Sequence, residues 1–399
     1  DLPATAVDPN TGAPTVASSA GPPQGVYRHV PFDLVLVPGV RLVSPSNVPT
    51  VNNFVLGLVG HTQVLHGFQL SLAGNMVDDE MRGLQFATGF NLSRGSTRGA
   101  QVASFANITL GEQRGLQVAG FTNIALGDVR GIQIGQLNWA SKDVRGAQIG
   151  VVNHIGGSAR APQVGVANVT RGQLRGSQIG VGNLAGEIRG PQIGVLNVGG
   201  TAEGVQIGVV NVGRKVRGLQ LGVLNIAESV EGASVGVLSL VGDGYHTANV
   251  WSGDVLPLNV GFKLGSRHVY TVFGFGTGQI EESPGSDKNK ALYGYSAGIG
   301  FHGNLGHPRL FLDVDAISTG FMTSGDWDGN DQVMSTLRVQ LGVRIFRNLA
   351  ITAGPTYNVY VRKADGPDYR PGWGVLEATD RSGSYQIRRF PGLQFGLQI

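Results

Sequence analysis

The chain has 399 residues, of which 64 are Gly, 41% are hydrophobic and only 14% are charged, a composition short of helix formers that points to β structure. Its 30 basic and 27 acidic residues give a net charge of +3, an imbalance too small to predict nucleic-acid binding. The absence of Cys excludes disulfides and thiolate metal sites, and no apolar run reaches the length of a membrane-spanning helix.

The chain opens with two segments of different character. Residues 1–26 are rich in Pro, Ala and Ser without periodicity, which predicts a disordered tail of the kind that signal-peptide removal leaves. Residues 27–44 include PFDLVLVPGVRLV, which alternates apolar and other residues in the manner of a strand. We expect this segment to be the first strand of a barrel whose remaining strands lie at 251–399.

Residues 45–250 repeat a Gln and an Asn at a spacing that contracts from 16 to 15 to 14 residues. The Gln series is Gln69, Gln85, Gln101, Gln117, Gln133, Gln148, Gln163, Gln178, Gln192, Gln206 and Gln220, followed by Ser234. The Asn series is Asn75, Asn91, Asn107, Asn123, Asn138, Asn153, Asn168, Asn183, Asn197, Asn211 and Asn225, followed by Ser239. This pattern predicts a parallel β-solenoid of about 12 coils in which both series form structural amide ladders.

Two further columns accompany the amides. Apolar residues are expected to fill the solenoid interior, among them Ile193, Val195, Ile207, Val209, Leu221 and Val223. An Arg recurs at the repeat junctions, and nearby Glu and Asp residues favour a solvated, self-compensating charge ladder. The alternative is a surface-binding stripe for anionic glycans or lipid headgroups, made by Arg114, Arg130, Arg145, Arg175, Arg189 and Arg217.

After residue 250 the repeats give way to long alternating strands. In LPLNVGFKL and LRVQLGVRI, apolar residues alternate with Gly and with polar or charged residues. Seven such strands are expected near 255–265, 267–276, 291–302, 308–318, 334–346, 348–361 and 387–399. With the segment 27–44 they make eight, and apolar residues facing lipid explain both strand faces. The predicted fold is therefore all-β, with the solenoid inserted after the first strand of an eight-stranded antiparallel outer-membrane β-barrel.

The links between these strands alternate in length. GSRH, GNLGHP and FRN are short, whereas residues 277–290, 319–333 and 362–386 are long. Short turns of outer-membrane barrels face the periplasm, so an inserted solenoid is expected on the extracellular side.

From Pro31 onward the chain resembles a family of bacterial outer-membrane surface-repeat proteins. In that family an N-terminal strand precedes tandem G-x-Q-[IV]-[AG]-x-x-N units, and a barrel-like region follows. The passages GVLSLVGDGYHTANV and LNVGFKLGSRHVY look like the family's entry into that region. The resemblance implies surface exposure and brings no catalytic residues.

Short motifs offer little support for an enzyme or a metal site. GYSAG matches a nucleophile elbow, but Ser296 occupies an inward position of an alternating strand with no helix after it. The acidic segment DWDGND offers Asp326, Asp328 and Asn330 as a metal candidate, yet Asp331 and Leu337 occupy positions where a calcium loop needs Gly and Glu. No catalytic residue and no cofactor are predicted.

Three functional classes follow. The leading one is a non-enzymatic outer-membrane surface protein whose barrel anchors a solenoid used for adhesion, self-assembly or partner binding. The alternatives are a small outer-membrane transport or pore component and an exported enzyme acting on polysaccharide. The expected partners are outer-membrane lipid and, on the solenoid, copies of the chain, other surface proteins or glycans, but not nucleic acid.

Overall fold

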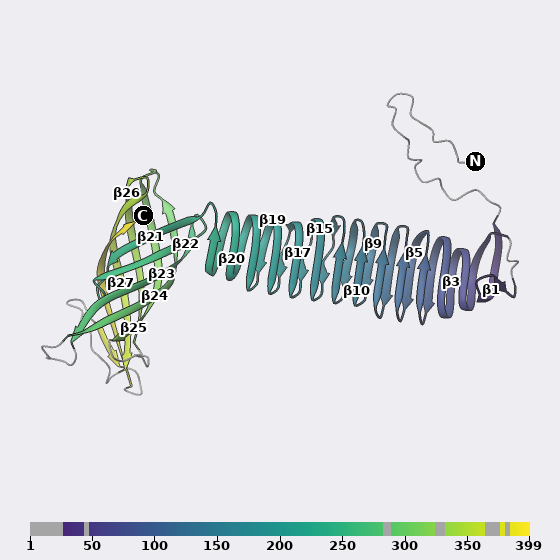
Figure 1. Cartoon of the computed structure of the whole chain (residues 1–399), viewed down its shortest axis with the longest axis horizontal. Helices are drawn as coiled ribbons and strands as arrows, with labels where there is room; N and C mark the ends of the chain where they lie inside the picture. The colour runs from purple at the N-terminus through teal and green to yellow at the C-terminus, as the bar shows by residue number, and fades with distance from the viewer. Residues whose placement is uncertain (1–26, 44–47, 282–288, 324–331, 364–375, 380–383) are drawn as a thin grey trace, which may run out of the picture. The chain divides into compact units, whose positions relative to one another are not determined.

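All regular structure in the described chain is β-strand. The computed structural model describes residues 27–43, 48–281, 289–323, 332–363, 376–379 and 384–399. The chain forms two compact units, residues 1–157 and residues 158–399. The predicted fold class is confirmed in its main parts: the protein is all-β, with a parallel solenoid of about 10 turns and an eight-stranded antiparallel barrel (Figure 1). No helix able to cross a bilayer occurs in these described ranges.

The first unit consists of solenoid coils. Its strands are β1 (Arg28–Val37), β2 (Val40–Arg41), β3 (Thr50–Ala87), β4 (Phe90–Ser93), β5 (Ser96–Ala103), β6 (Ala106–Thr109), β7 (Gln113–Ala119), β8 (Thr122–Ala125), β9 (Val129–Ile134), β10 (Leu137–Ala140), β11 (Val144–Ile149) and β12 (Val152–Ile155). Strand β3 runs through several coils, and from β4 to β12 strands that carry an Asn alternate with strands that carry a Gln. Strands of the same kind pair in parallel and in step, so that Gln133 lies beside Gln148 and Asn138 beside Asn153.

The second unit begins with further coils of the same kind. Their strands are β13 (Ala159–Arg160), β14 (Gln163–Val164), β15 (Ala167–Arg175), β16 (Gln178–Ile179), β17 (Gly182–Arg189), β18 (Gln192–Ile193), β19 (Leu196–Ile207) and β20 (Val210–Val241). The register is again in step, with Gln192 beside Gln206 and Asn197 beside Asn211. The repeat spacing therefore equals the coil length, and chemically equivalent residues form columns along each stack.

The barrel completes the second unit. Its strands are β21 (Tyr245–Ser252), β22 (Leu258–Gly265), β23 (Val269–Glu281), β24 (Asn289–Asn304), β25 (Leu310–Thr323), β26 (Val333–Phe346), β27 (Leu349–Lys363) and β29 (Tyr385–Gln398), with the short β28 (Leu376–Thr379) paired to β29. Neighbours in this order are antiparallel, and β21 pairs with β29 from Asn249–Gln398 to Ser252–Phe395. This last pairing closes eight strands into a barrel.

The expected first barrel strand is wrong. Residues 28–37 pair in parallel with β3, from Arg28–Thr50 to Val35–Gly57, and form an antiparallel hairpin with β2. The segment is therefore part of the solenoid, and the hairpin turns at Gly39, whose φ is +88°. The eighth barrel strand is β21, which the sequence-based boundary at residue 250 divided between two domains. Strand β21 has the sequence YHTANVWS, in which apolar and polar residues alternate over only a few positions, so it was not identified as a barrel strand.

The strand order also overturns the predicted insertion. Because all eight barrel strands follow the coils, the solenoid precedes the barrel instead of interrupting it. Strand β20 leads into the start of β21, at the barrel end that carries the short links 266–268, 305–309 and 347–348 and the C-terminus. The connections from β23 to β24, from β25 to β26 and from β27 to β29, which are longer in the sequence, join strand ends at the opposite end. The premise that put the solenoid on the long-loop side was therefore incorrect.

Candidate functional site

The predicted amide residues come together as two buried ladders in the coils. In the Gln ladder, Nε2 donates to the Oε1 of a Gln in the preceding coil, as from Gln206 to Gln192 at 2.8 Å. In the Asn ladder each Nδ2 donates to the Oδ1 of the following coil, as from Asn197 to Asn211 at 2.8 Å, and to a backbone carbonyl such as that of Ile207 at 2.9 Å. The two ladders thus run in opposite directions.

Each unit contains its own stretch of these ladders. The first unit joins Gln133 to Gln148 and Asn138 to Asn153. The second unit joins Gln163, Gln178, Gln192, Gln206 and Gln220, and also Asn168, Asn183, Asn197, Asn211 and Asn225. Their side chains are at most 2% exposed, so these contacts belong to the coil interior.

The expected apolar interior is wrong, because the residues assigned to it point outward. Ile193 is 39% exposed, Val195 50%, Val209 47% and Val223 51%, and Ile207 and Leu221 are also exposed. Successive side chains along a strand point to opposite faces, so a Gln and the residue next to it cannot both face inward. In these coils the Gln faces inward and its apolar neighbour faces outward. Beside the ladders the interior holds small or branched apolar residues such as Ala202 and Val216. The coil interior therefore combines amide ladders with apolar side chains, and the exposed surface is apolar over most of the perimeter.

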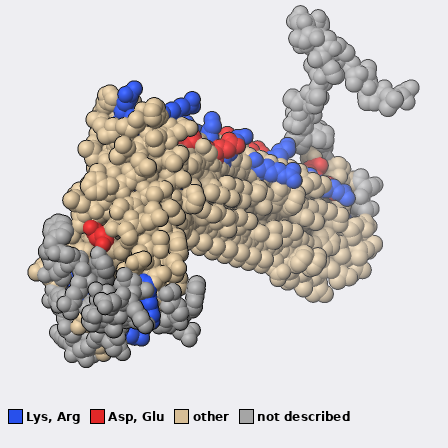
Figure 2. Space-filling model, turned by 60° about the vertical axis from the view of Figure 1, so that its left-hand side comes forward, with Lys and Arg blue, Asp and Glu red and all other residues tan. Residues whose placement is uncertain are grey.

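From residue 69 onward, the charged residues of the coils occupy one edge, whereas Asp33 and Arg41 in the first coil form a buried ion pair at 3.3 Å. Within each repeat from residue 69 to residue 241, consider the segment that begins at the ladder Gln or Ser and ends two residues after the ladder Asn or Ser. None of these segments contains Lys, Arg, Asp or Glu. All the charges lie in the links between these segments, which we call the charged edge. Figure 2 shows the blue and red residues gathered in this way beside a neutral lateral surface. The opposite edge, the corner edge, carries Phe105 and Phe121 in the first unit and Val195, Val209 and Val223 in the second.

The six Arg residues of the predicted stripe lie on the charged edge, and four of them pair with Glu. Glu112 contacts Arg114 at 2.8 Å and Arg130 at 3.2 Å, and the hydrogen bond from Arg114 lowers the pKa of its carboxyl. Glu203 contacts both Arg189 and Arg217, at 3.0 and 3.3 Å.

The remaining two Arg residues lack such a Glu contact in the described interactions. Arg175 donates to Gln173 at 3.0 Å, and Arg145 is exposed on the same edge. These contacts favour the self-compensating ladder, although basic residues still outnumber acidic ones along this edge.

An apolar groove lies in the first coils and was missed by sequence analysis. It encloses about 530 Å³ and is lined mainly by leucines, among them Leu34, Leu36, Leu42, Leu58, Leu70 and Leu72. Sequence analysis assigned Leu34, Leu36 and Leu42 to a barrel strand, so their contact with the leucines of β3 was not predicted. The groove continues the apolar outer surface of the coils at its N-terminal end.

The barrel wall is also apolar outside and polar inside, as the alternation predicted. In β26, Leu337 and Leu341 are 51% and 49% exposed, whereas Arg338 and Gln340 between them are 2% exposed. The same arrangement recurs in β22, where Phe262 is exposed and Lys263 is buried. Every second residue therefore projects into a polar lumen.

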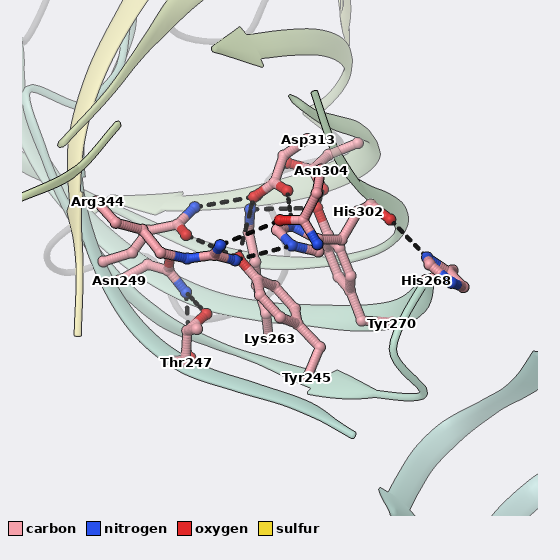
Figure 3. A network of polar contacts seen from close by, with 12 residues as sticks. Tyr245, Thr247, Asn249, Lys263, His268, Tyr270, His302, Asn304, Asp313 and Arg344 are labelled. Carbon is pink, nitrogen blue, oxygen red and sulfur yellow. Dashed lines mark hydrogen bonds and ion pairs between the residues drawn. The ribbon is translucent and has the colours of Figure 1, made fainter. Parts of the chain in front are cut away.

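A network of charges fills the lumen near the short-turn end (Figure 3). Lys263 Nζ lies 2.6 Å from Asp313 Oδ2 and 3.5 Å from Asp315 Oδ2. Asp315 also accepts hydrogen bonds from Tyr270 and Arg338, each at 2.5 Å. Asp313 contacts the His302 ring at 2.7 Å and accepts from Gln398 at 2.9 Å. Each buried charge thus has an opposite charge and further hydrogen-bonding partners.

The other end of the lumen is filled by the link between β21 and β22. Its Asp254 accepts hydrogen bonds from Thr356 at 2.9 Å and Asn358 at 3.0 Å. The next residues, Val255 and Leu256, are buried against Leu292, Phe321, Met334, Tyr360 and Phe390. The cavity between this link and Trp251 measures only about 20 Å³, about enough for one water molecule.

The catalytic and metal motifs have local structural roles or lie outside the described residues. Ser296 is buried in the lumen and shares a hydrogen bond of 2.8 Å with Thr319. His268 contacts the backbone carbonyl of His302 at 3.1 Å. No group of three His, Cys, Asp or Glu residues with metal-binding geometry occurs in the described ranges. Asp326, Asp328 and Asn330 lie outside them.

Comparisons with known proteins give no independent assignment. No family model matches the chain, and neither a curated protein nor a solved structure matches it. The resemblance to surface-repeat proteins therefore stays a prediction. Function is inferred from the apolar outer surfaces of the coils and the barrel, the amide ladders and the filled lumen.

Proposed function

We propose that this chain is a non-enzymatic membrane protein of the outer-membrane class, in which the barrel is the anchor and the solenoid is the binding module. The observation that carries the proposal is the inverted polarity of the barrel. Its outward side chains are Leu, Val, Ile, Phe and Tyr on most strands, while its ionisable residues Lys263, Asp313, Asp315 and Arg338 are buried in the lumen.

The energetics favour lipid over water around this wall. Removing a Leu or Phe side chain from water gains about 1.5–3 kcal/mol, and the outer wall exposes many of them. A closed barrel also leaves no unpaired strand edge, which is the condition for crossing a hydrocarbon layer. The solenoid offers repeated apolar columns and no assembled catalytic group in its described residues, which favours binding or self-assembly over chemistry.

A pore is the weaker candidate. An eight-stranded barrel is just wide enough for its side chains to fill. In this chain the network around Lys263 occupies one end of the lumen, and Leu256 with its apolar neighbours occupies the other. We expect no steady single-channel conductance when the full chain is placed in a planar bilayer.

The strand order changes the expected side of the membrane. Short turns of outer-membrane barrels face the periplasm, and β20 enters the barrel at the end with the short links. The proposal therefore puts the junction with the solenoid on the periplasmic side, the reverse of the sequence-based expectation. Adhesion to other cells would need an extracellular solenoid, so this strand order no longer supports it. Partner binding and self-assembly are possible on either side of the membrane.

Replacing Leu341 by Lys tests the anchor. A Lys on the lipid face near the membrane midplane should cost about 2–4 kcal/mol, against about 0–1 kcal/mol near the interface. Phe346→Lys, at the short-turn end of the same strand, is the matched control. Folding of each full-length variant into lipid vesicles is followed by heat-dependent electrophoretic migration during urea titration. Equal stability of the two variants, with the protein in the aqueous fraction, would overturn the proposal.

A further inference from the structure

The solenoid surface is unusual for a module surrounded by water. Three of its sides carry apolar columns: the two strand faces, with residues such as Leu221 and Leu196, and the corner edge, with Val209 and Val223. Only the charged edge carries Lys, Arg, Asp and Glu along the repeats. Contiguous apolar surfaces of this extent mark contact with a membrane or another protein.

In the coils of the second unit, residues 158–241, the buried side-chain polar groups behind these faces have hydrogen-bond partners. Asn211 Nδ2, for example, donates to Asn225 Oδ1 at 2.8 Å and to the carbonyl of Leu221 at 3.0 Å. At the corner, the amide of Val209 donates to the carbonyl of Val195 at 3.0 Å. Backbone groups that pair internally can enter hydrocarbon without the cost of an unsatisfied donor or acceptor. The coils of the second unit meet this requirement.

The contact between the last coil and the barrel gives the orientation. At the corner edge of that coil, Gly236 O accepts a 2.6 Å hydrogen bond from Thr271, which alternates along β23 with the lumen residue Tyr270. At its charged edge, Asp243 pairs with Arg267 in the short turn at 2.9 Å. The corner edge therefore meets the outer barrel wall farther from the barrel end than the charged edge does.

We propose that the solenoid coils of the second unit are embedded in one lipid leaflet, with acyl chains covering their corner edge and strand faces and headgroups meeting their charged edge. This proposal rests on the membrane location of the barrel and concerns the leaflet at its short-turn end. The corner edge of the last coil contacts the outer barrel wall, which is the surface that lipid would cover. Lipid is therefore favoured over a second copy of this chain as the group that covers the corner edge.

The dimensions of the coil fit a leaflet. A strand rises about 3.3 Å per residue, so the chain from Arg217 to Gly222 extends roughly 17 Å from charged edge to corner. Half of a hydrocarbon core about 30 Å thick is about 15 Å. The excess of basic over acidic residues on the charged edge suits anionic headgroups.

Single-Cys labelling tests the proposal, because the native chain has no Cys. Val209→Cys and Val223→Cys report the corner edge, Arg217→Cys the charged edge, and Leu341→Cys the barrel wall. Each full-length variant is labelled with an environment-sensitive fluorophore and reconstituted in phosphatidylethanolamine and phosphatidylglycerol vesicles. Quenching is then measured with acyl-chain spin-labelled lipid and with aqueous iodide.

The proposal predicts that the labels at Val209 and Val223 are quenched by the lipid probe, as at Leu341, and lose iodide quenching. The Arg217 label should show the reverse. Iodide quenching at both corner positions, with lipid quenching at Leu341, would overturn the leaflet proposal and leave the anchor intact. Shielding of the corner labels from both quenchers would overturn it in favour of a second copy. Loss of lipid quenching at Leu341 as well would overturn the membrane anchor itself.

Discussion

At the residue scale, the amides of the coils are structural groups with little freedom to do anything else. Asn183 donates to Asn197 at 2.9 Å and to the carbonyl of Ile193 at 3.0 Å, and accepts from Asn168 at 2.9 Å. Each amide donates to one neighbouring coil and accepts from the other. Replacing one member therefore leaves a polar group without a hydrogen-bond partner in both neighbouring coils. A buried polar group left without a partner costs about 1–3 kcal/mol.

We therefore expect Asn183→Leu to lower the free energy of unfolding by about 1–3 kcal/mol. Arg175→Leu, on the charged edge, should lower it by less than about 1 kcal/mol, because exposed polar contacts contribute little. Urea titration of both full-length variants, followed by circular dichroism in lipid vesicles, makes the comparison. Equal losses would show that burial of the Asn ladder is not what holds the coils together.

At the element scale, the coils depend on Gly where the backbone of one coil approaches the next. Gly218 has a φ of +138°, and a Cβ there would lie 2.0 Å from the carbonyl oxygen of Gly204. Gly182, in a strand of the same unit, has nothing within 4 Å of such a Cβ. One repeat thus contains Gly positions with opposite tolerance to substitution.

Gly218→Ala should destabilise the second unit by at least about 1–3 kcal/mol through backbone strain, with further loss as the coils separate. Gly182→Ala should change stability by no more than about 0.5 kcal/mol. Amide hydrogen exchange across residues 200–235 would locate the effect. Similar protection in the two variants would contradict the close coil-to-coil approach at Gly218.

At the scale of the whole molecule, the barrel contains all the strands it needs after residue 244. Strand β21 closes it against β29, and the N-terminal hairpin takes no part. A fragment of residues 245–399 should therefore fold in detergent as a barrel that migrates differently before and after boiling. A chain joining residue 45 to residue 252 lacks β21 and should not close. Closure of the second chain, with failure of the first, would contradict the strand order.

Sequence periodicity predicts the columns of the solenoid but not which column faces inward. The Gln and Asn spacing revealed the coils, and alternation in LRVQLGVRI revealed both faces of β26. The inward side of a coil was misjudged because apolar residues such as Ile193 were assumed to need burial, which holds only for a module surrounded by water. The hairpin of β1 was misplaced because Phe32, Leu34 and Leu36 look the same on a barrel wall and on an apolar coil.

The opposite directions of the two ladders have an electrical consequence. A column of amides that all donate the same way adds its dipoles end to end, as a helix does. The Gln column of the second unit points its donors toward lower residue numbers, and the Asn column points them toward higher ones. Their fields therefore largely cancel along the stack. A coil stack of this kind can be lengthened by whole repeats without accumulating a macrodipole, a useful property in a medium of low dielectric constant.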